Sequence, residues 1–466
     1  MGISLSKKIR VFCVRKFISS FKRILFCWDD DLSKSKAVTK IQAVLVIAIV
    51  VVSGVIGGFA YLLWGGSGSS GESIRIGVLG DLDNVGGRDA WQGAVLAAEQ
   101  VNAEGGVLGR QFEIVAEDDD SETSGDISFA TSAITKLITA DKVDFLFSSN
   151  RIFPNHYQDI CADHKIIFFS MALDDEMAER VADDYNRYKG FFRATTGNNT
   201  SAVNGIVDGI KTLRDYTGFN KIAFLTIGVP SAQAMTSGVA DLLQEQGFDI
   251  VYERPFPPET FDFSSYFSAI EAAGAEILYP VVAGSACVPF VKEYYDRQSP
   301  LVIWGNVMLA SDSDFWEITD GKCASVSFVG FPVISGYPLT NKTVPTREAY
   351  IERWGEVPSG GAASTYDLIR FILPDAIRRA GTTETDAVIS ALEETNVETS
   401  LARHFVYTST HDIMIGEAGP NKPSEDYLLV CLFQWQDGDQ VPVYPKEIME
   451  EVEATYTFPD WSGPWD

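Results

Sequence analysis

The sequence is poor in the residues and motifs that most enzymes and metal sites use. It contains only 4 histidines in 466 residues, and their spacing does not match a metal site. No C-x-x-C, H-E-x-x-H, G-x-S-x-G or phosphate-binding P-loop pattern occurs. A formal G-x-G-x-x-G pattern at Gly66, Gly68 and Gly71 follows no strand, so it does not predict a dinucleotide site. We therefore expect a protein that is not an enzyme and that binds no metal and no cofactor.

Positive charge is scarce outside the first 40 residues. That segment has ten basic and three acidic residues, a net charge of +7, whereas the rest of the chain has 27 basic and 61 acidic residues, a net charge of −34. An acidic body of this size repels the phosphates of nucleic acid, so we exclude nucleic acid as a partner. The acidity otherwise indicates a soluble surface.

An uncharged run covers residues 41–64. As a helix it would be roughly 36 Å long, enough to span a hydrocarbon core of ~30 Å. Tyr61 and Trp64 lie at one end, where interfacial aromatic residues are common. The basic flank predicts that residues 1–40 stay in the cytoplasm and that the main body is extracytoplasmic. A cleaved signal peptide is the alternative, but the apolar run is longer than usual for one. We predict one retained transmembrane helix in the cell membrane.

Cysteine usage does not decide whether disulfides form. In the predicted topology Cys13 and Cys27 are cytoplasmic, where thiols stay reduced. The four extracytoplasmic cysteines allow three pairings, and the sequence does not select one: Cys161, Cys287, Cys323 and Cys431. The apolar surroundings of Cys161 and Cys431 favour buried thiols.

Strand and helix patterns alternate along the outer chain, after a Gly/Ser linker at 65–73. This alternation predicts an α/β protein with doubly wound parallel sheets. The strand candidates are Ile74–Leu79, Phe112–Ala116, Val143–Phe147, Ile166–Ser170, Lys221–Thr226, Ile250–Pro255, Ile277–Val282, Leu301–Trp304 and Ser325–Phe331. The helix candidates are Ile127–Thr139, Ala202–Tyr216, Ala232–Gln246, Tyr266–Ala273, Ala286–Asp296, Arg347–Trp354, Ser364–Ala380 and Thr385–Thr395.

The stretch from Trp91 to Asp120 is the most informative, because it joins an apolar helix to a strand through the Gly105-Gly106 corner. The sequence of this stretch, QGAVLAAEQVNAEGGVLGRQFEIVAEDDDSE, resembles the first βαβ unit of the extracytoplasmic solute-binding proteins for branched-chain amino acids. Residues 221–276 and 364–392 resemble the same family. The resemblance implies the type I periplasmic-binding-protein fold, in which two lobes are joined by a three-crossing hinge.

The resemblance also places the lobe boundaries. The chain should cross between lobes near Phe191–Thr195, near Phe331–Tyr337 and near His404–Asp412. Lobe 1 would then comprise residues 74–192 and 335–402, and lobe 2 residues 193–334 and 403–466. We expect the outer part to be a monomer.

Ligands of doubly wound sheets bind beyond the carboxyl ends of the strands. In lobe 1 the residues at these positions are Ser149, Asn150, Arg151, Ser170 and Ala172. The family often has a Gly-x-x-Ser-Ser run here that holds a carboxylate, whereas this chain has Asn150 and Arg151. An arginine could bind a carboxylate bidentately, or it could point into solvent.

Further candidates come from lobe 2 and from the first loop of lobe 1. The resemblance points to Ser231, Ser285 and Asn306, with Asn306 replacing the acid that commonly holds an ammonium group. Tyr366 matches a family aromatic, although packing explains it equally well. Asp81 and Gly86 line the first loop, and Gly86 implies a roomy pocket.

The resemblance predicts a binding protein that closes around a small polar organic ligand, such as an amino-acid-like molecule, an amide or a carboxylate. It would deliver the ligand to an ABC transporter whose permease and ATPase subunits are separate chains. The alternative is a ligand-sensing ectodomain that acts through a separate signalling protein, since residues 1–40 are too few for a signalling domain. The sequence does not name the ligand.

Overall fold

The computed structural model describes residues 71–194, 197–416, 427 and 431–465. The predicted cytoplasmic segment, the transmembrane run at 41–64 and most of the linker lie outside the described residues. Among the helices of the described ranges, none is both long and apolar enough to cross a bilayer.

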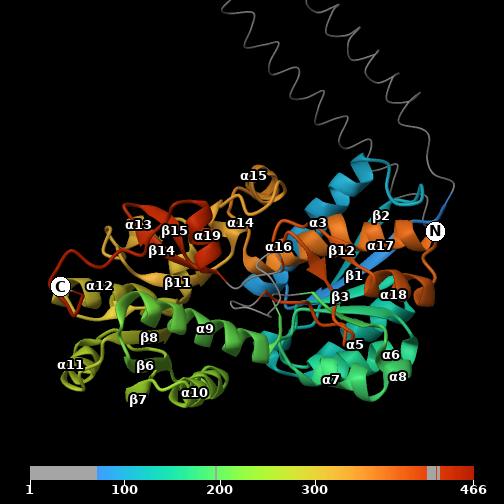
Figure 1. The fold of residues 1–466 in the computed structure, drawn as a ribbon. Helices are drawn as coiled ribbons and strands as arrows, with labels where there is room; N and C mark the ends of the chain where they lie inside the picture. Colours follow the sequence, from blue (N-terminus) through green and yellow to red (C-terminus); the bar gives the residue numbers. More distant parts are fainter. Residues whose placement is uncertain (1–70, 195–196, 417–426, 428–430, 466) are drawn as a thin grey trace, which may run out of the picture. The chain divides into compact units, whose positions relative to one another are not determined.

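The first sheet has five parallel strands in the order β2-β1-β3-β4-β5 (Figure 1). Its strands are β1 (Ile74–Gly80), β2 (Phe112–Asp118), β3 (Phe145–Ser148), β4 (Ile167–Ser170) and β5 (Phe191–Arg193). The first four confirm sequence predictions to within two residues at each end. We predicted residues 191–195 only as a crossing, but β5 pairs with β4 and completes the sheet.

Helices cover both faces of this sheet. The connecting helices are α3 (Val85–Ala103), α4 (Ser121–Ser124), α5 (Ile127–Thr139), α6 (Pro154–His164), α7 (Glu176–Asp183) and α8 (Tyr185–Tyr188). On one face α3 packs against a later segment, the helix α16 (Gly360–Asp367). A Cβ atom on Gly93 of α3 would lie 2.2 Å from the carbonyl oxygen of Ala362, so glycine permits this close approach.

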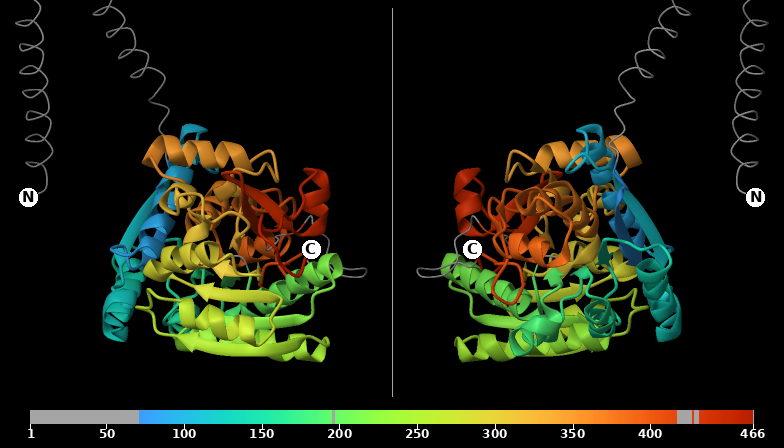
Figure 2. Two further views of the ribbon diagram at one scale, coloured as in Figure 1. Left: turned by 90° about the vertical axis from the view of Figure 1, so that its left-hand side faces the viewer. Right: turned by 90° about the vertical axis from the view of Figure 1, so that its right-hand side faces the viewer.

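The second sheet is also parallel, with the order β10-β8-β6-β7 and β9 beside β8 (Figure 1, Figure 2). Its strands are β6 (Lys221–Ile227), β7 (Asp249–Phe256), β8 (Ile277–Val282), β9 (Val302–Ile303) and β10 (Asn306–Val307). Its helices are α9 (Asn199–Thr217), α10 (Pro230–Glu245), α11 (Ser264–Ala272) and α12 (Cys287–Arg297), with the short helices η1 (Gly284–Ala286), η2 (Met308–Ser311) and α13 (Phe315–Ile318). These bounds confirm the predicted alternation of strands and helices.

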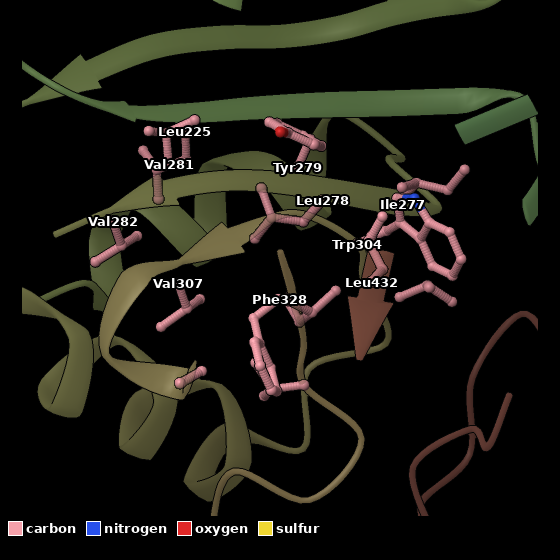
Figure 3. Packing of buried hydrophobic residues seen from close by; sticks show 14 of the residues in the cluster. Leu225, Ile277, Leu278, Tyr279, Val281, Val282, Trp304, Val307, Phe328 and Leu432 are labelled. Atoms are coloured by element: carbon pink, nitrogen blue, oxygen red, sulfur yellow. The ribbon is translucent and has the colours of Figure 1, made fainter. Parts of the chain in front are cut away.

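An antiparallel sheet completes lobe 2. It contains β11 (Ser327–Gly330), β14 (Cys431–Gln436) and β15 (Asp439–Tyr444), and α19 (Lys446–Glu451) follows. Figure 3 shows how this sheet joins the core: Trp304 lies between Ile277 and Leu432, and Phe328 lies below Leu278. Trp304 is 1% exposed, so its indole is one of the largest side chains buried in this core.

The remaining elements belong mostly to the return of the chain into lobe 1. They are α14 (Pro332–Ser335), α15 (Thr343–Trp354), the π-helical turn η3 (Leu368–Ile372), α17 (Leu373–Ala380), α18 (Thr385–Glu393), β12 (Asn396–Val397) and β13 (Phe405–Val406). The predicted helix at 364–380 is thus one continuous run of α16, η3 and α17, interrupted by a π turn.

The packing moves two of the proposed lobe boundaries. We assigned Arg193 and residues 403 onward to lobe 2, yet Arg193 is the last residue of β5. Phe405, Tyr407 and Ile413 are buried in the core of lobe 1. Arg193 and the return segment up to Ile415 therefore pack with the first sheet rather than with the second.

The four described cysteines are free thiols and all are buried. Cys287 donates a hydrogen bond to the carbonyl of Val282 at 3.4 Å. Burial raises the pKa of Cys323 to about 11 and that of Cys431 to about 12. These thiols act as small apolar core residues, which resolves the pairing question for the described cysteines.

Candidate ligand site

The strand register brings the lobe 1 candidates to one edge of the first sheet. Ser148, the last residue of β3, is paired with Leu79 of β1 on one side and with Ser170 of β4 on the other. Ser170 is in turn paired with Arg193 of β5. The loops that begin with Asp81, Ser149 and Met171 therefore leave the sheet side by side, as the sequence predicted.

Ser149 packs directly on the end of β1. Its amide N–H donates to the carbonyl of Leu79 at 3.0 Å. A Cβ atom on Gly80 would lie 2.1 Å from Ser149 Oγ, so the absence of a side chain at Gly80 makes room for this hydroxyl. The hydroxyl donates to the same carbonyl of Leu79 at 3.5 Å, so only the lone pairs of this oxygen are left for a ligand.

Asn150 is a positioning residue whose side chain is fully engaged. Its Nδ2 donates to the Asp119 carboxylate at 2.9 Å and to the Tyr157 hydroxyl at 3.3 Å. Its Oδ1 accepts from the amides of Ile152 and Phe153 at 2.7 and 2.9 Å. These contacts set the turn after β3 and hold the backbone on both sides of the exposed residue Arg151.

The carboxylate that anchors this turn is Asp119, which is fully buried. It accepts from the Tyr157 hydroxyl at 2.8 Å and from Ser121 Oγ at 2.7 Å. Burial, followed by the charge of Asp119, holds the pKa of Tyr157 well above its ordinary value, so the phenol remains a donor. The sequence showed only three carboxylates in a row at the end of a strand, with no sign of which one turns inward.

The second loop is held by Arg193, which sequence reasoning did not select. The amide of Ala172 donates to Ser170 Oγ at 3.2 Å, and its carbonyl accepts from an Arg193 guanidinium nitrogen. The same guanidinium donates to the carbonyl of Asp174 at 2.8 Å and pairs with Asp412. Both backbone groups of Ala172 therefore have hydrogen-bond partners inside the protein. The Ser170 hydroxyl holds this loop in place by accepting from the Ala172 amide.

A cluster of side chains ties the crossing segments together; we call Arg193, Asn198, His411 and Asp412 the crossing cluster. Asp412 pairs with Arg193 and also accepts from Asn198 Nδ2 at 3.0 Å. Asn198 caps the N-terminus of α9, the first helix of lobe 2. His411 stacks on Phe192 with ring centroids 4.2 Å apart. The cluster therefore joins two chain crossings that are more than 200 residues apart.

The structure places the remaining lobe 1 candidates in two different surroundings. Asp81 is 3% exposed and accepts from Asn84 at 2.8 Å, and Gly86 is exposed in the first turn of α3. Tyr366 lies between α16 and α3, where its hydroxyl donates to Gln100 at 2.5 Å. The position of Tyr366 fits the packing interpretation.

The lobe 2 candidates also share one edge of their sheet. Asn306 of β10 is paired with Val281 of β8, and Val281 with Thr226 of β6. Ser285 is exposed in η1 directly after β8, and Ser231 follows Pro230 at the start of α10. Asn306 is half-buried. Each lobe thus gathers its candidates at the carboxyl edge of its parallel sheet.

Comparison with known families decides the identification. Residues 73–417 match the model of the periplasmic binding protein family. The chain belongs to that family. Members are solute-binding proteins for transport rather than enzymes. The match spans most of the described body, which agrees with the two doubly wound sheets.

The known relatives of this periplasmic binding protein are distant in sequence, but the similarity extends over most of both chains. The Leu/Ile/Val-binding protein homolog 7 of Brucella abortus is 23% identical over 402 residues, covering 82% of this chain and 94% of the relative. A putative branched-chain amino acid ABC transporter from Silicibacter pomeroyi has a TM-score of 0.72 at 19% identity, covering 84% and 100% of the two chains.

A second solved structure shares the fold at lower similarity. It is the branched-chain amino acid transporter substrate binding protein LivJ from Streptococcus pneumoniae in complex with isoleucine, with a TM-score of 0.60 and 17% identity. The structural match covers 80% of this chain and 100% of the LivJ chain. The likeness is one of fold, because the identity is too low to carry over the contacts of a bound ligand.

Proposed function

We propose that this chain is a membrane-anchored, extracytoplasmic solute-binding protein that captures a small polar organic ligand and delivers it to an ABC transporter permease. The observation that carries the proposal is the gathering of polar candidates at the carboxyl edges of two doubly wound sheets in one periplasmic binding protein. Lobe closure would bring the two edges onto one ligand, and the ligand would shift the open–closed equilibrium toward the closed form.

The charges at these edges favour a carboxylate or an amide as the ligand. Arg151 is exposed and lies within the turn that Asn150 and Asp119 hold in place, so a cation is presented on a rigid support. In lobe 2 the neutral Asn306 offers an amide where an ammonium-binding acid would otherwise be expected. We therefore expect no strong preference for leucine-like zwitterions. The ligand contacts would come from Arg151, Ser149, Ser170, Asp81 and Gly86 in lobe 1 and from Ser231, Ser285 and Asn306 in lobe 2, with Asn150, Ala172 and Tyr366 supporting them.

The first test is a thermal-shift screen of the full chain with amino acids, amides, carboxylates, sugars and short peptides. A ligand that binds only the folded state raises the melting temperature, so at least one amide or carboxylate should do so. Permease and ATPase genes beside the gene for this chain should accompany that result. A genomic neighbourhood with a signalling protein instead would favour the sensing function.

Replacing Arg151 with alanine should weaken the binding of a carboxylate ligand by roughly 1.5–3 kcal/mol, the range for hydrogen bonds to charged groups. Isothermal titration calorimetry measures this change. Arg353→Ala is the matched control, because Arg353 pairs with Glu99 on an exposed surface of α15 and should leave affinity unchanged. Unchanged affinity in Arg151→Ala, or tight leucine binding by the unmodified protein, would refute the proposed pocket chemistry.

The membrane part of the proposal has its own test. The net charge of +7 before the apolar run and −34 after it predicts an N-in, C-out topology with the anchor retained. Intact-mass spectrometry of protein extracted from membranes should find residues 1–40 still attached. A mature N-terminus near Gly65 would show that the segment is a cleaved signal.

A further inference from the structure

The most exposed large apolar side chains of the described body lie at the carboxyl edges of its two parallel sheets. In lobe 1 they are Phe129 and Ile152, which are 57% and 52% exposed. In lobe 2 they are Phe261 and Met308, which are 64% and 54% exposed. Every other large apolar side chain in the described ranges is 51% exposed or less. Single exposed apolar residues are common on protein surfaces, so the position that these four share is the informative feature.

Two of the four lie beside ligand candidates. Ile152 follows Arg151 directly, in the loop after β3, which is the central strand of the first sheet. Met308 comes two residues after Asn306 and directly after β10. The other two lie beyond β2 and β7, the end strands whose loops carry no ligand candidate. Each lobe therefore has one exposed apolar side chain at its candidate site and one outside it.

Hydrogen bonds hold the backbone at both inner positions. The amide of Ile152 donates to Asn150 Oδ1 at 2.7 Å, within the turn that Asp119 anchors. The carbonyl of Met308 accepts from Ser311 Oγ at 2.9 Å, at the start of η2. Because these backbones are fixed inside the protein, each apolar side chain stays next to the polar candidate of its own lobe.

Each candidate edge thus offers a polar group and an apolar group together, Arg151 with Ile152 and Asn306 with Met308. A ligand with polar groups alone would leave both apolar side chains in water. A ligand with a polar head and an apolar body would cover them and gain the free energy of removing apolar surface from water. The unbranched thioether of Met308 adapts to bodies of different shape.

We infer that the ligand is amphipathic, a carboxylate or amide head on an apolar body without an ammonium group, and that Ile152 and Met308 select for the body. The inference rests on the proposed function, because it concerns the same site. On lobe closure the head binds Arg151 and Asn306, and the body covers Ile152 and Met308.

Calorimetry on the full chain tests the ligand class with named probes. Acetate and acetamide carry the head alone, whereas 4-methylpentanoate, phenylacetate and their amides add an apolar body. At least one probe with a body should bind ten-fold or more tightly than the short probe with the same head, because each buried CH₂ group corresponds to about four-fold in affinity. Equal affinity of the long and short probes would overturn the inference and leave the proposed function standing. Binding of none of these probes would overturn both.

Four serine variants test the two residues. Ile152→Ser and Met308→Ser should each weaken the binding of the best long probe by about four- to twelve-fold, the effect of burying about half of such a side chain, and should leave the short probe unchanged. Phe129→Ser and Phe261→Ser are the matched controls, because they remove equally exposed apolar side chains outside the candidate site. All four positions are on the surface, where substitutions change stability little. Losses in the first two variants no larger than in the controls would overturn the assignment of Ile152 and Met308.

Discussion

Replacing Arg193 with alanine should lower the free energy of unfolding of the extracytoplasmic body by about 3–5 kcal/mol, the cost of breaking a buried ion pair from one side. Arg193 is fully buried and pairs with Asp412, whose side chain is nearly buried. The variant leaves this carboxylate without its cation and leaves the carbonyls of Ala172 and Asp174 without their donor. Urea unfolding followed by tryptophan fluorescence measures the change.

Two comparisons test whether burial is the cause. Arg353→Ala breaks an exposed pair with Glu99 and should cost less than about 1 kcal/mol. The double variant Arg193→Met with Asp412→Leu removes both charges and should recover part of the loss, because no buried charge is left unpaired. A loss in Arg193→Ala no larger than in Arg353→Ala would contradict the assignment.

The second large effect is expected at Asp119. Replacing it with alanine should lower the free energy of unfolding by about 2–6 kcal/mol, because the Tyr157 hydroxyl and the Asn150 amide each lose a buried acceptor at about 1–3 kcal/mol. The same variant should weaken ligand binding, since Asn150 then no longer holds the turn that contains Arg151. Urea unfolding and calorimetry measure the two effects.

Two tyrosine variants provide a matched pair for this network. Tyr157→Phe removes one buried hydroxyl and should cost about 1.5–3 kcal/mol, the range for a hydrogen bond to a charged group, because this hydroxyl donates to the Asp119 carboxylate. Tyr185→Phe removes a hydroxyl that donates to Glu393 at 2.6 Å from a side chain that is 42% exposed, and it should cost less. If Asp119→Ala unfolds at the same urea concentration as the unmodified protein, the network does not stabilise the fold.

Local patterns were sufficient to predict most of the regular elements. Apolar runs such as Ile74–Gly80 and Ile277–Val282 are strands in the structure, and the periodic segment Ile127–Thr139 is a helix with the predicted bounds. The strand β5 was missed as part of the sheet because three residues carry too little pattern to show pairing. It is recognised only when β4 is seen beside it.

Part of the candidate site could likewise be predicted from the sequence, and part could not. Sequence reasoning placed Ser149, Arg151 and Ser170 correctly at the ends of parallel strands, because topology follows from the βαβ order. It could not show that the Asn150 side chain donates hydrogen bonds to Asp119 and Tyr157. These partners are 31 and 7 residues away in the chain, and no local sequence pattern indicates the contacts.

By itself, the sequence determined the class of the protein: the βαβ order, the two sheets, the absence of metal and nucleotide motifs, and the membership in a family of binding proteins. These properties depend on local periodicity and on extended patterns, which a chain carries before it folds. The tertiary structure decided which polar groups are engaged inside the protein. Arg193 and Asp412 are 219 residues apart in the chain, and their charges are stabilised together only because the crossing segments bury both at one place. A pairing of that kind depends on the distance between the charges and on their desolvation, and the local sequence predicts neither of these.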